Sequence, residues 1–198
     1  MLRRSLIVLA TLAVALSVVP LAGAVIVHVR VEGKTQTIFG PSEPRAFGTN
    51  ALDVLLNAAR AAEFFAHVTT TSFGPYVDQV GYYPGAGQTG WVFKVNGVSP
   101  PVGADQVKLK DGDRVLWYFA QFGSTGGPST LDLRGTAPGC YRAVAQDDQG
   151  AEKVPPGLVF HIGATKTVPA PAGRICPKGP HGLVWATAPG TVRSNRLP

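Results

Sequence analysis

The side chains that could carry chemistry are few and widely scattered in this 198-residue chain. Asp111 and Asp113 flank a glycine, which is typical of a tight turn, and the further oxygen ligands of a calcium loop are missing. The four histidines lack the spacing that brings two ligands to one metal ion. They are His28, His67, His161 and His181. These patterns predict no metal centre.

Two further motifs have simpler explanations than chemistry. The glycines at 85, 87 and 90 satisfy G-x-G-x-x-G, which holds a pyrophosphate only where a helix begins directly after it. Here a strand pattern starts at Trp91, so a hairpin loop is predicted. No G-x-S-x-G elbow occurs, and Ser124 lies in a glycine-rich stretch that would not hold a nucleophile rigidly. We therefore expect no enzyme; a hydrolase with a site assembled from distant residues is a weaker alternative.

The first 24 residues have the layout of a secretory signal peptide. Arg3 and Arg4 precede an apolar run over 6–19, and Ala22-Gly23-Ala24 supplies an A-x-A cleavage site. We expect cleavage after Ala24 and a secreted, extracellular protein whose only membrane contact is through the signal peptide. Ala24 stands where a lipoprotein would carry its cysteine, and no later segment is long and apolar enough for a C-terminal anchor.

The two cysteines, Cys140 and Cys176, both lie in the second half of the chain. A lone pair in an exported protein is typical of one disulfide, and the spacing excludes a CxxC redox site. We predict a Cys140–Cys176 bond that stabilises this half and leaves no thiolate nucleophile.

Charge patterning argues against nucleic acid as a partner. The chain has 18 Lys and Arg against 12 Asp and Glu, but the basic excess is spread singly through residues 123–198. No basic run or basic–aromatic stripe is present. A cell-envelope component or another protein is the expected partner.

Residues 25–122 predict an α+β fold. Alternating valines over 25–32 indicate a strand, whereas the leucines within 49–65 follow the period of an amphipathic helix. Further strands are expected at 67–73, 76–83, 90–95 and 114–122. This order predicts a β-grasp-like mixed sheet with one helix across a face.

The rest of the chain predicts a second, smaller domain. Residues 123–130 are typical of a flexible linker. Short strand patterns separated by Gly and Pro over 131–198 predict a small all-β sandwich. This part loosely resembles bacterial immunoglobulin-like or prealbumin-like modules, which implies a spacer or adhesion element.

The last strand of the first domain is apolar on both faces. Val115, Trp117 and Phe119 share one face, while Leu116 and Tyr118 share the other. One set would pack against the helix. The second set would pack against the C-terminal tail (the second domain) or bind a partner or a flat ligand. Docking on the tail is the favoured interpretation. If the face binds a ligand or partner, its candidate contacts are Tyr82, Tyr83, Leu116, Trp117 and Tyr118.

Three segments of the first domain, ALDVLLNAA, GWVFKVNG and GADQVKLKDGDRVLWYF, resemble the transcobalamin-like C-terminal domain family. The resemblance covers about 25–122 and implies a β-grasp module of exported bacterial proteins. The cobalamin carriers of that family also have a large helical barrel domain, which is absent here. The matching motif residues are Trp91, Asn96, Gly97, Asp111, Gly112, Asp113 and Trp117.

The main expectation is a secreted, non-enzymatic binding or cell-surface interaction protein without a required cofactor. The alternative that the resemblance implies is a corrinoid-binding accessory protein, with cobalamin as the ligand, that acts with a separate helical partner.

Overall fold

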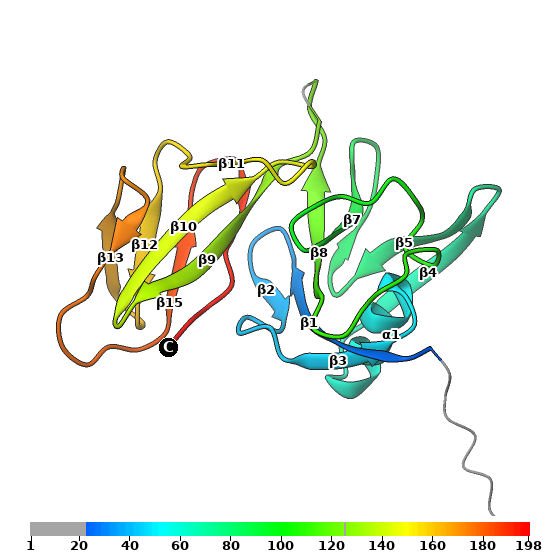
Figure 1. The fold of residues 1–198 in the computed structure, drawn as a ribbon. Coiled ribbons are helices and arrows are strands. Elements are labelled where there is room, and N and C mark those ends of the chain that lie inside the picture. The colour runs from blue at the N-terminus through cyan, green and yellow to red at the C-terminus, as the bar shows by residue number, and fades with distance from the viewer. Residues whose placement is uncertain (1–22, 125) are drawn as a thin grey trace, which may run out of the picture.

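The computed structural model describes residues 23–124 and 126–198, which form two lobes side by side (Figure 1). The protein is almost all-β, with 48% strand and 6% helix, in several small sheets and a half-barrel. The expected α+β β-grasp is therefore wrong. The physical reason is that one short helix covers the sheet, while strands expected to join a single mixed sheet pair into separate sheets.

The first lobe is built on a five-stranded sheet in the order β2-β1-β8-β7, with β3 also paired to β1. β1 and β8 run parallel, with Val29 opposite Val115, and the other pairs are antiparallel. The strands are β1 (Val25–Glu32), β2 (Thr37–Phe39), β3 (Arg45–Gly48), β7 (Thr89–Val95) and β8 (Arg114–Gln121).

A second, three-stranded sheet has the order β4-β5-β6 and extends from the side of this lobe (Figure 1). The register between β4 and β5 shifts at His67/Val68. Such an irregularity increases the twist of a hairpin and turns it away from its neighbours. Its strands are β4 (Ala66–Thr71), β5 (Gly74–Val80) and β6 (Tyr83–Pro84).

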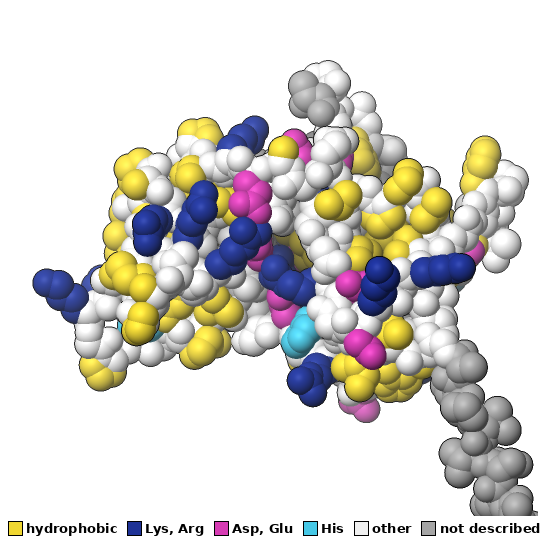
Figure 2. All heavy atoms as spheres, in the orientation of Figure 1, with side chains coloured by type: hydrophobic (Ala, Val, Ile, Leu, Met, Phe, Trp, Pro, Cys, Tyr) yellow, Lys and Arg dark blue, Asp and Glu magenta, His cyan; other side chains and the backbone are white. Residues whose placement is uncertain are grey.

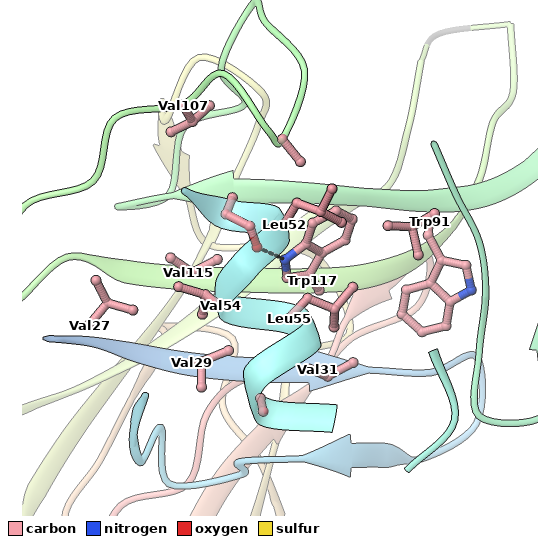
Figure 3. Close-up of a cluster of buried hydrophobic side chains, with 14 of the residues drawn as sticks. Val27, Val29, Val31, Leu52, Val54, Leu55, Trp91, Val107, Val115 and Trp117 are labelled. Carbon is pink, nitrogen blue, oxygen red and sulfur yellow. Dashed lines mark hydrogen bonds between the residues drawn. The ribbon is translucent and has the colours of Figure 1, made fainter. Parts of the chain in front are cut away.

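The helix α1 (Ala51–Ala61) covers the first sheet, and its core is drawn in Figure 3. Its first turn is capped by Asn50, whose Oδ1 accepts the Asp53 N–H at 2.8 Å. Leu55 is fully buried against the sheet, and the Trp117 indole N–H donates to the Ala51 carbonyl at 3.0 Å. The predicted helix is thus present, although it is shorter than the apolar pattern suggested.

The second lobe packs two small sheets around one apolar cluster that includes Leu133 and Phe160. Of the expected immunoglobulin-like module, the structure shows the all-β fold. One sheet has the order β11-β10-β9-β16, with β14 on β10, and the other has the order β13-β12-β15. The strands are β9 (Ser129–Ala137), β10 (Cys140–Gln146), β11 (Glu152–Lys153), β12 (Val159–Ile162), β13 (Lys166–Pro169), β14 (Arg174–Ile175), β15 (Val184–Thr187) and β16 (Thr191–Val192).

Two sequence-based boundaries remain predictions. The signal peptide lies outside the described residues apart from Gly23 and Ala24, and β1 begins at Val25. The linker over 123–130 overlaps β9, because Ser129 and Thr130 already pair with β16. Within the described part of the chain, no helix has both the length and the apolar character needed to cross a bilayer.

The Cys140–Cys176 disulfide is confirmed, with an S–S distance of 2.04 Å and a sequence separation of 36 residues. Cys140 is the first residue of β10, and Cys176 directly follows β14 (Arg174–Ile175), which pairs with β10. The bond therefore closes the loop that runs from the start of β10 through β11, β12 and β13 to the end of β14.

Removing this bond is expected to destabilise the protein by about 3–4 kcal/mol, because it no longer restricts the unfolded chain. The variant is Cys140→Ser with Cys176→Ser, and urea denaturation measures the loss. Wild-type protein reduced with dithiothreitol is the control and should show a similar loss. An unchanged midpoint in both samples would contradict the prediction.

Candidate ligand-binding pocket

The second apolar face of β8 is buried between the lobes. Leu116, Tyr118 and Ala120 form a cluster with Val192 of β16, and Tyr118 is only 2% exposed. Burial raises the pKa of the Tyr118 hydroxyl well above its ordinary value, and the negative charge of Asp148 adds to the rise. The structure thus places this face against the tail, in agreement with the favoured interpretation.

The five predicted contact residues do not form one site. Tyr82 is 91% exposed, and with Tyr83 it lines a hollow that is also bordered by residues 36–38 and 63–65. Leu116 lines a narrow gap at the junction of the lobes. Trp117 and Tyr118 reach a third, larger pocket.

The motif residues of the predicted family resemblance have structural roles. Asn96 and Gly97 have φ values of 52° and 85°, as a type I′ turn requires. The Asn96 side-chain amide donates to Asp113 Oδ1 at 2.8 Å, and Asp111 Oδ1 accepts the Ile26 N–H at 2.8 Å. These residues fix the hairpin and the start of β1. Gly112, with φ 83°, completes the second turn.

Six aromatic side chains line a pocket of about 390 Å³ beside β7. The Trp91 indole N–H donates to the Tyr83 carbonyl at 2.8 Å, and that of Trp117 donates inward to Ala51. Both indoles therefore offer only carbon surface to the pocket. We call this cavity the aromatic pocket; its aromatic lining residues are Tyr76, Trp91, Phe93, Trp117, Tyr118 and Phe122.

Polar groups gather at one end of the aromatic pocket. The Ser99 hydroxyl donates to Asp148 Oδ1 at 3.0 Å, and the Ser99 N–H donates to the Asp148 carbonyl at 2.8 Å. Asp148 is the one charged side chain among the described residues that line the pocket, and it belongs to the second lobe. Both lobes therefore build the site.

A fully buried lysine lies behind this polar end. The Lys94 amine donates to the carbonyls of Gln146 and Asp147 at 3.0 and 2.7 Å, and it lies 3.7 Å from Asp148 Oδ1. Burial lowers the pKa of Lys94, although the charges of Asp148 and Asp147 oppose this shift. Lys94 thus ties β7 to the loop that positions Asp148.

An ionic chain also joins the lobes, with each arginine–carboxylate contact at an N–O distance of 3.3 Å or less. Figure 2 shows basic and acidic side chains close together where the lobes meet. Burial alone would raise the pKa of Asp132, but its arginine partners outweigh burial and lower it. In order of contact the members are Arg193, Glu32, Arg30, Glu43, Arg114, Asp132, Arg134 and Glu152.

No motif or spacing in the sequence marked Lys94, Ser99 or Asp148 as site residues. The only signal was that Lys94 is a charged residue within the otherwise apolar strand 90–95. Its partners lie about fifty residues further along the chain, so the pattern gave no indication of their position.

Comparison with known families gives one match, to a domain of unknown function (DUF4430), over residues 48–121. This chain is similar to that family from α1 to the end of β8. A relation to transcobalamin-like proteins remains a prediction. No curated protein matches the chain.

Among solved structures, one match is a protein from Ruminococcus gnavus ATCC 29149 described as a "putative metal binding protein". It is 14% identical, with a TM-score of 0.36, over 50% of this chain and 99% of the other. A similarity this distant does not indicate a shared function. Within 23–124 and 126–198, no group of three or more His, Cys, Asp or Glu side chains is placed to hold a metal ion.

Proposed function

We propose that this protein is a non-enzymatic binding protein and that the aromatic pocket is its ligand site. The observation that carries the proposal is a cavity of about 390 Å³ with an aromatic lining and a few polar groups at one end. Ligand sites commonly have volumes of roughly 300–1,000 Å³ and this combination of surfaces. Ser99 donates directly to a carboxylate, without the intervening histidine that activates a serine nucleophile, which favours binding over catalysis.

Removing one aromatic wall should weaken binding of an apolar probe. Tyr76 is 43% exposed, so Tyr76→Ser should remove contact area in the pocket with little effect on folding. We expect the affinity for the neutral dye Nile red to fall about tenfold, which corresponds to about 1.4 kcal/mol, since tyrosine is enriched among the few contacts whose loss costs more than about 1 kcal/mol. Dye fluorescence measures the affinity.

The matched control is Tyr82→Ser, because Tyr82 is exposed and lines a different hollow. This variant should bind Nile red as the wild type does. If wild-type protein fails to bind the dye, or if both variants bind equally, the aromatic pocket is not the site. Competition by cobinamide in the same assay would support the corrinoid alternative.

We further propose that the protein is exported and acts outside the cytoplasm. The disulfide supports this proposal, since such bonds persist mainly in oxidising compartments. The A-x-A triplet directly before β1 adds to it.

We expect the mature protein to begin at Val25, because signal peptidase cleaves after an A-x-A triplet. Mass spectrometry of the culture supernatant measures this end. A chain found only in membranes with its first 24 residues attached would contradict export.

A further inference from the structure

Alternate residues of β7 direct their backbone N–H and C=O groups either toward β8 or toward the free edge of the strand. The N–H of Asn96 donates to Arg114 and that of Phe122 donates to Gln88, so the even-numbered residues of β7 face β8. The N–H groups of Thr89 and Val95 instead donate to Ala86 and Val98, on the opposite side. Successive residues of an antiparallel strand alternate in this way. The backbone N–H and C=O groups of Trp91 and Phe93 must therefore point away from β8.

No strand of the described residues occupies that side at Trp91 and Phe93. β7 is the last strand of its sheet, and β5 belongs to a different sheet. The two strands meet at one end, where the Gly85 N–H donates to the Asp78 carbonyl at 2.7 Å. Farther along, the aromatic pocket separates them, with residues 75–77 on one wall and 91–93 on the other.

Tyr76 marks the point where the gap opens. Its hydroxyl lies so close to Gly90 that a Cβ atom there would come within 2.5 Å of it. The absence of a side chain at Gly90 therefore leaves room for the Tyr76 hydroxyl beside β7, and a larger residue there would displace it. Beyond it, the backbone groups of Trp91 and Phe93 face the pocket without a backbone partner among residues 23–124 and 126–198.

We propose that the aromatic pocket takes an extended peptide of a partner protein, which pairs with β7 at Trp91 and Phe93. This inference rests on the function proposed above. Residues two apart on a strand repeat about every 6.8 Å, a spacing that a second peptide backbone matches. An apolar side chain of the peptide fills the pocket, as alternate side chains do in strand addition.

Charge complementarity selects the kind of peptide. Asp148 is the charged lining residue, and its side chain is 46% exposed, whereas its neighbour Lys94 is fully buried. The Lys94 amine is thus out of a ligand's reach, whereas the Asp148 carboxylate is accessible, which favours a basic residue beside the apolar one. A compact apolar molecule would fill the cavity but leave the β7 backbone groups unpaired, and unpaired buried groups are costly.

The test begins with 12-residue random peptides displayed on phage and selected on the mature protein. Binders should alternate apolar residues at period two, carry basic residues and displace Nile red. The strongest binder is then synthesised with N-methyl groups on either the odd or the even residues. One of these two methylated peptides should bind at least tenfold more weakly, because it lacks the backbone N–H groups that donate to β7. The peptide with the opposite methylation pattern should bind nearly as well as the unmodified peptide.

Hydrogen exchange locates the contact. The amide protons of Trp91 and Phe93 should exchange at least tenfold more slowly when the peptide is bound. Those of Val92 and Lys94 already face β8 and serve as the matched control. Slower exchange at Trp91 and Phe93, together with a loss of affinity for only one of the two N-methylation patterns, would support the proposal.

The failures are separable. If Nile red binds and Tyr76→Ser weakens it, but no selected peptide shows these effects, the peptide inference is overturned and the binding function stands. Equal sensitivity to both methylation patterns also overturns it. If Nile red does not bind, the proposed function itself fails.

Discussion

Replacing Glu32 by alanine is expected to lower the free energy of unfolding by about 3–5 kcal/mol, since it takes a carboxylate partner from the buried Arg30 and from Arg193. Glu32 is fully buried, and it binds Arg30, whose side chain is only 3% exposed, and Arg193 from the second lobe. Without Glu32, Arg30 keeps its 3.3 Å contact to Glu43, so its buried guanidinium has one carboxylate partner in place of two. Urea denaturation followed by tryptophan fluorescence measures the loss.

The ionic chain itself supplies the control. Glu152 lies at its exposed end, where its side chain is 31% exposed and contacts Arg134. Glu152→Ala should cost no more than about 1 kcal/mol, as is usual for solvent-exposed pairs. Equal losses in the two variants would mean that burial does not decide the strength of these contacts.

The second large effect is expected at Tyr118. Tyr118→Ala should destabilise the protein by about 3–5 kcal/mol, the usual cost of removing a large aromatic side chain from a core. Tyr118 packs with Leu116 and Val192 where the lobes meet, so the variant leaves a cavity there. Thermal unfolding and urea denaturation both measure it.

Tyr82→Ala is the matched control, because Tyr82 is 91% exposed, and its stability should stay within about 0.5 kcal/mol of the wild type. A small loss for Tyr118→Ala would show that the lobes separate readily in solution. It would also make the junction too weak to hold Asp148 at the aromatic pocket.

The two predictions bear on the site because the pocket is shared. Its aromatic walls come from the first lobe, and Asp148 comes from the second. The buried amine of Lys94, the ionic chain and the Tyr118 cluster all cross the junction. A junction stabilised in three ways keeps the pocket in one shape, which lowers the entropy lost when a ligand binds.

Local patterns in the sequence determined several features. The leucine spacing predicted α1, and the lone cysteine pair predicted the disulfide. Each of these depends on neighbouring residues or on a single possible partner. The two-sided apolar pattern of β8 likewise predicted that something must cover Tyr118.

Only the tertiary structure decided which strands share a sheet. β5 has a clear strand pattern, but pairing with β4 and β6 and the shift at His67/Val68 place it in a sheet separate from that of β7. Because of this separation the predicted β-grasp sheet does not form, and a gap remains between β5 and β7. The aromatic pocket and the partners of Lys94 join residues far apart in the chain. Such contacts depend on the packing of whole sheets, and a periodic pattern records only which face of one strand is apolar.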